Sequence, residues 1–172
     1  CDSLRLVDLT GLADVSPEDP EPEFVDINAA GETVVTMQEN NHIVIVSRAG
    51  EVIADFSAGA VDLDGIDATD ERGALLFNES QPGRLREPDA VKWIDDTHFA
   101  TANEGDMDGG SRGWTIFAKD GTEVYESGAS FEHALVQIGH YPDTRSDAKG
   151  VEPESIETAT FDGTPLVFVG SE

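Results

Sequence analysis

The sequence contains a single cysteine, few basic residues and no long apolar run. One cysteine, Cys1, supports neither an internal disulfide nor a zinc cluster, so it does not indicate a redox compartment. Because no run of about 18 apolar residues occurs, we expect no membrane insertion. Serine-hydrolase, nucleotide-binding and dinucleotide-binding motifs are also missing, which leaves those classes of protein without support.

Basic residues are scarce relative to acidic ones. Ten Lys and Arg against 36 Asp and Glu give a formal net charge of -26. A surface of this sign repels nucleic acid and anionic membranes and accumulates cations, so we expect no nucleic-acid partner. This balance favours a saline or calcium-rich exterior and predicts an extracellular, periplasmic or cell-surface location. A cytoplasmic acidic protein is the alternative.

What the sequence does contain is a series of short segments rich in Val, Ile, Phe and Thr, separated by turn residues. Ten such segments predict ten strands joined by hairpins, and hence an all-β fold. Only residues 127–139 show helical spacing, with Phe131, Leu135 and Ile138 on one face and Ser130 as the N-cap. We expect irregular loops at 57–86 and 139–151.

A motif of Glu, Pro and an acidic residue occurs three times, beginning at Glu21, Glu87 and Glu152. These starts are 66 and 65 residues apart, and each motif leads into a strand, a turn and a second strand. Two further strands follow in the first two copies. Four antiparallel strands per repeat are typical of a β-propeller blade, so we predict β-propeller-like repeats, with an open meander or sandwich of about ten strands as the alternative.

The repeats divide the chain into four predicted segments. Residues 1–20 contain the end of a preceding blade, including a strand at 3–9, followed by a linker. Residues 21–86 form a blade with a long acidic loop, and residues 87–151 form a blade with a short helix and a loop. Residues 152–172 form the first half of a third blade. A propeller closes with about four to eight blades, so about two and a half blades predict a fragment of a larger one. The remaining blades are then its expected partners.

Repeated carboxylates form a candidate metal site. Equivalent residues of successive blades lie on rings around a propeller channel, and glutamates that open the first strand and close the second should meet at one end of the blades. Clustered carboxylates repel one another unless a cation intervenes, and Ca2+ accepts six to eight oxygen ligands in flexible geometry. We therefore predict Ca2+ as a cofactor, with the following metal ligands: Glu21, Glu39, Glu87, Asp89, Glu104, Asp106, Glu152 and Glu154.

A structural role for the same carboxylates is the alternative, in which each pairs with a base such as Arg86, Arg145 or Lys149, or caps backbone amides. Bridging calcium ions could instead hold a phosphate and polarise it toward attack by water. The predicted phosphate or ligand contacts are Arg112, in a Gly-rich hairpin, Arg145 and Lys149. No residue is predicted to be catalytic.

The stretches "EPEFVDI", "TANEGD" and "RSDAKGVEPE" resemble the choice-of-anchor I family of secreted bacterial proteins, which is related to phytase-like propeller proteins often labelled alkaline phosphatase. The resemblance covers nearly the whole chain from residue 20 onward and implies an extracellular or cell-surface seven-bladed propeller. This sequence departs from the family pattern in two places: Ser155 stands where Gly is usual, and the insertion after "TANEGD" is shortened to residues 107–113. The matching motif residues are Glu104, Gly105, Asp106, Arg145, Asp147, Lys149, Glu152 and Glu154.

The expected function is that of a calcium-associated ligand-binding or cell-surface module within a secreted acidic β-propeller. Its ligand would be a phosphorylated small molecule or a surface ligand. A calcium-dependent phosphomonoesterase, resembling alkaline phosphatase or phytase, is the alternative that the family resemblance implies. An acidic scaffold without bound metal is the third.

Overall fold

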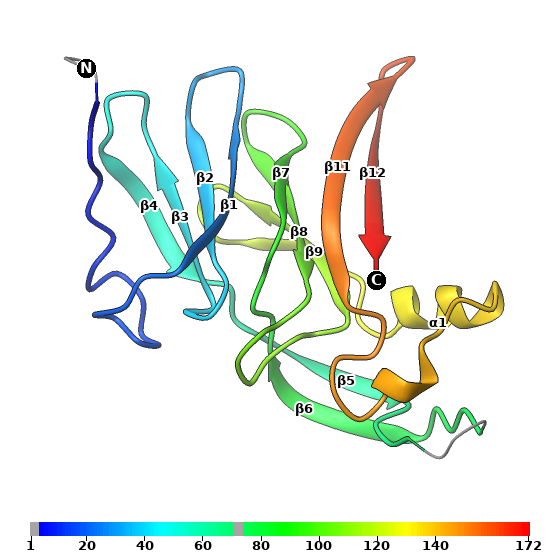
Figure 1. Cartoon of the computed structure of the whole chain (residues 1–172). Helices are drawn as coiled ribbons and strands as arrows, with labels where there is room; N and C mark the ends of the chain where they lie inside the picture. Colours follow the sequence, from blue (N-terminus) through cyan, green and yellow to red (C-terminus); the bar gives the residue numbers. More distant parts are fainter. Residues whose placement is uncertain (1–3, 71–73) are drawn as a thin grey trace.

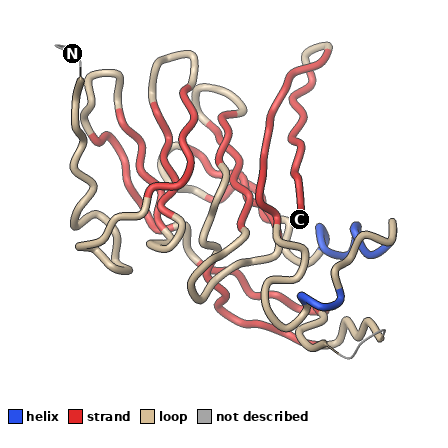
Figure 2. Tube along the Cα trace, viewed as in Figure 1, coloured by secondary structure: helices blue, strands red, loops and turns tan. Residues whose placement is uncertain are grey.

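The computed structural model describes residues 4–70 and 74–172, so Cys1 lies outside the described residues (Figure 1). Strands make up 43% of the chain and helices 7%, which confirms the all-β prediction. The tube view shows that most strands run as hairpins (Figure 2). The ten strands predicted within residues 21–172 are all present, together with two that were not predicted.

Two four-stranded antiparallel sheets and one two-stranded hairpin correspond to the three sequence repeats (Figure 1). The first sheet consists of β1 (Pro22–Ile27), β2 (Thr33–Met37), β3 (His42–Val46) and β4 (Val52–Ser57). The second consists of β7 (Val91–Trp93), β8 (His98–Asn103), β9 (Gly113–Ala118) and β10 (Glu123–Glu126). The hairpin consists of β11 (Pro153–Phe161) and β12 (Thr164–Ser171). Every strand of a sheet pairs with its neighbour along the chain, so the predicted four-stranded antiparallel repeat is confirmed.

The two additional strands form a hairpin beneath the second sheet in Figure 1. They are β5 (Ala60–Ile66) and β6 (Glu79–Leu85), and the expectation of an irregular loop at 57–86 is wrong for this part of it. β6 contains Pro82 and Gly83, which weaken a strand signal. A two-stranded sheet tolerates them because each strand has a free edge, where a missing N–H removes no ladder bond.

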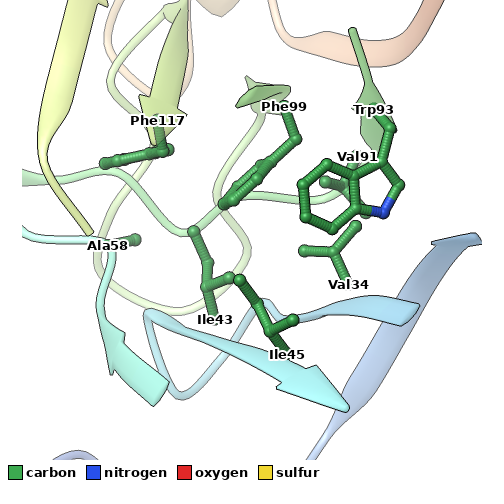
Figure 3. Close-up of a cluster of buried hydrophobic side chains, with 8 residues drawn as sticks. All are labelled: Val34, Ile43, Ile45, Ala58, Val91, Trp93, Phe99 and Phe117. Carbon is green, nitrogen blue, oxygen red and sulfur yellow. The ribbon is translucent and has the colours of Figure 1, made fainter. Parts of the chain in front are cut away.

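The main core lies between the two four-stranded sheets (Figure 3). Trp93 packs edge-on against Phe99, with ring centroids 5.3 Å apart and planes at 75°. Each fully buried side chain of this size contributes about 1.5–3 kcal/mol through removal of apolar surface from water. The two sheets are therefore held face to face chiefly by hydrophobic packing among Val34, Ile43, Ile45, Ala58, Val91, Trp93, Phe99 and Phe117.

A second cluster covers the other face of the first sheet. Residues 7–13 pack Val7, Leu9, Leu12 and Ala13 against β2 and β3. No strand is assigned in the described part of the predicted strand at 3–9. With both faces covered, β3 is buried at every position, which accounts for its unbroken apolar run from Ile43 to Val46.

The first strands of the three repeats are neighbours, with β7 packed between β1 and β11. The Asp26 carboxylate accepts a hydrogen bond from the Trp93 backbone N–H at 2.9 Å, and the Thr158 hydroxyl donates to the Trp93 carbonyl at 2.6 Å. Lys92 Nζ lies 3.2 Å from the Asp26 carboxylate and 3.4 Å from that of Glu157. Asp26, Lys92 and Glu157 hold equivalent positions in the three repeats, so repetition along the chain becomes adjacency in space.

The predicted helix is present as α1 (Ser130–Gln137). Its N-cap is Ala129 rather than Ser130, whose hydroxyl instead donates to the Ser127 carbonyl at 2.6 Å. The one fully buried residue of α1 is Glu132, whereas Ile138, on the predicted apolar face, is 67% exposed. The apolar spacing thus located the helix, in which Phe131 and Leu135 are half-buried, but it did not predict that Glu132 is the residue buried against the protein.

Candidate functional site

The predicted carboxylates lie at the end of the sheets opposite the β1–β2, β7–β8 and β11–β12 turns. Pro22, at the start of β1, pairs with Met37 at the end of β2, and Pro153, at the start of β11, pairs with Ser171 at the end of β12. The opening and closing acidic residues of each repeat therefore share one end, as the sequence predicts. We call the group formed there by Glu23, Asp89, Glu104, Glu154 and Lys149 the acidic junction.

Asp89 is the centre of the acidic junction. It is only 7% exposed, and its backbone is fixed by bonds from its N–H to the Ala102 carbonyl at 2.9 Å and from the Thr36 hydroxyl to its carbonyl at 2.6 Å. Within the described residues its carboxylate receives no hydrogen bond. Burial, followed by the negative charges of Glu104, Glu23 and Glu154 in that order, raises the pKa of Asp89 to about 7, while the charge of Lys149 opposes the rise.

The third residues of the three motifs, Glu23, Asp89 and Glu154, are therefore electrostatic neighbours. Asp89 is buried because a repeat flanks it on either side, whereas Glu23 and Glu154 are exposed. Glu23 was missed among the predicted site residues, although its motif position matches those of Asp89 and Glu154. Comparing the third positions of the three copies would have found it.

The first motif residues behave differently, and Glu87 is the clearest case. Its carboxylate accepts hydrogen bonds from the backbone N–H groups of Asp106 and Met107 at 2.8 Å each and of Asp108 at 3.1 Å. Glu87 is 1% exposed and has a φ of 44°, which takes it out of the regular strand alternation assumed for a ring of first residues. Its carboxylate closes the loop that follows β8 and is fully engaged there.

The Glu152 carboxylate is also occupied by hydrogen bonds within the protein. It has a φ of 41°, is 3% exposed and accepts a bidentate pair of hydrogen bonds from Arg145, one of them from Nε at 2.7 Å. A predicted metal ligand and a predicted phosphate contact thus satisfy one another. This is the arrangement described by the structural alternative, in which a motif glutamate pairs with a nearby base.

Arg112, the other arginine among the predicted ligand contacts, is completely buried. Its Nη1 donates to the Asp67 carbonyl at 2.9 Å and to the Glu132 carboxylate at 3.3 Å, and its Nη2 donates to the Ser146 carbonyl at 2.6 Å. Burial raises the pKa of Glu132, and the charge of Arg112 counteracts that rise. The guanidinium therefore joins β5–β6, α1 and the loop before β11, and it has no surface to offer a phosphate.

The remaining predicted residues border the acidic junction. Partial desolvation raises the pKa of Glu39, and the negative charges of Glu21 and Asp106 add to the effect. Gln38, which was not predicted, donates from its side-chain amide to the Glu104 carboxylate at 3.2 Å and so links the first repeat to the second. Glu21, Glu39 and Asp106 thus form a second group of mutually repelling carboxylates beside the first.

Lys149 lies among these carboxylates rather than facing solvent as a free phosphate contact. Its Nζ is 3.3 Å from the Glu104 carboxylate and 3.7 Å from that of Asp106. Throughout the described ranges, 4–70 and 74–172, no three His, Cys, Asp or Glu side chains are arranged to hold a metal ion. The carboxylates are close enough to interact electrostatically, but their side chains would have to converge to coordinate a cation.

Replacing Asp89 by Asn should stabilise the protein by ~2–4 kcal/mol near pH 8. The pKa of Asp89 is about 7 in the folded state and 3.8 ordinarily, so the wild type loses stability as the pH rises through that interval. Asn cannot ionise, and the difference in unfolding free energy between variant and wild type should widen between about pH 4 and about pH 7 and level off above that in chemical denaturation. Glu154→Gln, at the exposed equivalent position, is the control and should have a small effect. A gap that does not change with pH would contradict the prediction.

A comparison with protein families identifies a domain family that covers nearly the whole chain. The model of the choice-of-anchor I domain matches residues 4–109 and 107–172, and the two segments meet in the loop that Glu87 closes. A comparison with curated proteins finds no match. Domains of this kind are associated with cell-surface or secreted proteins, and no helix in the described part of the chain is long and apolar enough to cross a membrane. Because the matched segments extend over nearly the whole sequence, the chain belongs to the choice-of-anchor I domain family.

Proposed function

We propose that this chain is part of a secreted, phytase-like β-propeller and acts as a calcium-associated binding module at the cell surface. The observation that carries the proposal is Asp89, a residue 7% exposed whose carboxylate has no hydrogen-bond partner among the described residues and whose pKa is raised by carboxylates of both adjacent repeats. An isolated buried carboxylate is costly unless it is protonated or compensated by a cation. A cation at the acidic junction would supply that compensation.

Calcium suits this position for chemical reasons. The available donors are carboxylate oxygens and the Gln38 amide, which are hard ligands. They come from separate repeats and do not form a rigid cage, and Ca2+ tolerates irregular geometry better than Mg2+ does. A divalent cation bridging them would hold adjacent repeats together, and its open positions could accept an anionic ligand.

Apolar faces support the propeller part of the proposal. Phe161, Leu166 and Phe168 on the β11–β12 hairpin are 58%, 41% and 50% exposed. On the first strand, β1, Val25 and Ile27 are 60% and 63% exposed. The two four-stranded sheets already pack face to face, so further blades of the same protein would continue that arrangement and cover these side chains.

The binding module is preferred over the phosphomonoesterase because two of the three predicted phosphate contacts are engaged elsewhere. Arg112 is buried against Glu132 and Arg145 is paired with Glu152. Only Lys149 remains near the acidic junction, and it lies among carboxylates. The described residues therefore supply little to hold a phosphate directly.

Calcium should raise the melting temperature of the protein near pH 8. Ligand at about 100 times its dissociation constant stabilises a folded protein by about 2.7 kcal/mol, which corresponds to a shift of several degrees. Thermal unfolding in calcium, in magnesium and in chelator measures the effect, and magnesium should stabilise less. Identical melting curves in calcium and chelator would refute calcium association. Chelator-sensitive release of phosphate from a chromogenic ester would favour the enzyme instead.

A further inference from the structure

Two turns of five residues occupy equivalent places in the first two repeats. In residues 47–51, which connect β3 to β4, the first N–H donates to the fifth carbonyl at 2.8 Å and the fourth N–H to the first carbonyl at 2.9 Å. The same two bonds, at 2.9 and 3.0 Å, close residues 118–122 at the connection of β9 to β10. The fourth residue of each turn is a glycine with a φ of 84°. Arg48 and Lys119, the second residues of these turns, are therefore equivalent.

Lys119 joins the second repeat to the first. Its Nζ lies 2.7 and 2.5 Å from the two carboxylate oxygens of Glu32, in the turn between β1 and β2. The same turn also contacts the connection of β7 to β8, because the Ala30 N–H donates to the Asp96 carboxylate at 3.3 Å. The acidic first turn of the first repeat thus contacts both turns of the repeat that follows it.

An acidic first turn is a property of every repeat in the chain. Between β1 and β2 it carries Glu32, between β7 and β8 Asp95 and Asp96, and between β11 and β12 Asp162. We therefore expect a further repeat of the same kind to present a carboxylate at this position.

Arg48 lacks the carboxylate partner that Lys119 has. Most of the described lysines and arginines form an ion pair, but neither Arg48 nor Arg5 forms one with any described residue. The paired bases are Arg86, Lys92, Arg112, Lys119, Arg145 and Lys149. With 36 acidic residues against 10 basic ones, a shortage of carboxylates does not explain two neighbouring unpaired arginines.

Both arginines line a cavity of about 470 Å3 formed by the two turns of the first repeat, residues 28–32 and 47–51, which we call the turn pocket. Arg5 Nη1 donates to the Arg48 carbonyl at 3.0 Å, so the N-terminal segment runs beside the β3–β4 turn (Figure 1). A Cβ at Gly50 would lie 3.5 Å from Arg5 Cδ, and one at Gly121 would lie 2.9 Å from Phe56 Cγ. The N-terminal segment therefore covers the first repeat as β4 covers the second, and the turn pocket corresponds to the place that the Glu32 turn takes beside Lys119.

We propose that the turn pocket binds the acidic first turn of a further repeat of the same protein, whose carboxylate pairs with Arg48 as Glu32 pairs with Lys119. The inference rests on the propeller part of the proposed function. It concerns the end of the sheets opposite the acidic junction, however, and it requires no calcium. A guanidinium group presents a fork of N–H donors that matches a carboxylate in two parallel hydrogen bonds.

The overall charge of the chain does not prevent this contact. The formal charge of -26 repels an acidic turn, but at physiological ionic strength charges more than about 8 Å away are largely screened. The two arginines that line the turn pocket lie within that range of a turn bound there. The local attraction therefore outweighs the repulsion from distant carboxylates.

The test is a double-mutant cycle with a hairpin peptide of residues 22–37, which contains the acidic turn of the first repeat and is closed by a disulfide between added terminal cysteines. Fluorescence anisotropy measures its binding to the full chain in chelator. The peptide should bind about three- to fivefold more tightly than its Glu32→Gln form, because an exposed ion pair contributes an effect of this size. This preference should vanish in Arg48→Gln and persist in Arg48→Lys.

Arg84→Gln is the matched control, because Arg84 forms no ion pair with a described residue and lies outside the turn pocket. It should keep the preference for the acidic peptide. Arg48 is exposed, so Arg48→Gln should melt at the same temperature as the wild type, and a lost preference then reports lost binding rather than unfolding.

The remaining outcomes overturn the inference without deciding calcium association, which melting curves in calcium and chelator test separately. Failure of the peptide to bind the wild type would exclude docking of an acidic turn. An undiminished preference in Arg48→Gln would exclude the pairing with Arg48. Self-association of the chain in sedimentation velocity that Arg48→Gln abolishes would assign the turn pocket to a second copy of the chain instead of a further repeat.

Discussion

Replacing Arg112 by Met should destabilise the protein by ~3–5 kcal/mol, because removal of one partner of a buried ion pair leaves the other charge uncompensated. Glu132 is completely buried, and the positive charge of Arg112 is the main compensation for its negative charge. The Asp67 and Ser146 carbonyls would also lose the hydrogen bonds that Arg112 donates to them. The midpoint of urea unfolding measures the loss. The change should also loosen α1 and the loop before β11, which hydrogen exchange would detect.

Two further variants distinguish loss of the ion pair from a general effect of removing an arginine. Arg112→Met combined with Glu132→Gln should recover part of the lost stability, since no buried charge is then left without a partner of opposite sign. Arg84→Met is the matched control, because Arg84 makes only one recorded hydrogen bond in the described chain, to the Gly110 carbonyl at 3.3 Å, and should cost less than about 1 kcal/mol. A loss below 1 kcal/mol for Arg112→Met would show that the buried pair is not essential.

Replacing Glu87 by Gln should cost ~2–4 kcal/mol, because three backbone N–H groups donate to its carboxylate and hydrogen bonds to charged groups are worth about 1.5–3 kcal/mol each. Gln retains a single acceptor oxygen and places an amide N–H against a backbone donor. The loop at 104–110 should then open more readily. Hydrogen exchange of the Asp106, Met107 and Asp108 amides, together with urea unfolding, checks the prediction.

Glu21 provides the matched control for Glu87. It holds the same motif position in the first repeat, and the contact recorded for it is a backbone one, from its N–H to the Asn40 side-chain oxygen at 2.9 Å. Glu21→Gln should therefore change stability by less than about 0.5 kcal/mol. Comparable losses for the two variants would mean that the motif glutamate has the same role in each repeat, contrary to the hydrogen bonds at Glu87.

Strand positions and the repeat were predictable because their signals are local. Val- and Ile-rich segments bounded by turn residues located all ten strands of the sheets and hairpin, and the Glu-Pro-acid motif placed equivalent residues at one end of them. The β5–β6 hairpin escaped prediction because its strands alternate with aspartates or contain Pro82 and Gly83. The partners of these residues, and not their own propensity, make them strands.

The roles of individual charges were less predictable. Sequence spacing grouped Glu87 with Asp89, yet the carboxylate of Glu87, at a positive φ, accepts hydrogen bonds from the loop after β8, while the pKa of Asp89 is raised by carboxylates of the neighbouring repeats. Arg112, predicted as a phosphate or ligand contact from its place in a glycine-rich hairpin, is instead buried against Glu132 of α1. In each case the outcome depends on which segments pack nearby, and those segments are distant in the sequence.

The sequence by itself determined the acidic character, the all-β class and the period of about 65 residues, because composition, side-chain alternation and repetition are properties of the chain alone. Only the tertiary structure decided which carboxylates repel one another across repeats and which accept hydrogen bonds from backbone amides or arginines. The free-energy cost of an ionised carboxylate depends on its burial and on its distance from other charges, and for Asp89 both are set only when the chain packs it against β2 and β8.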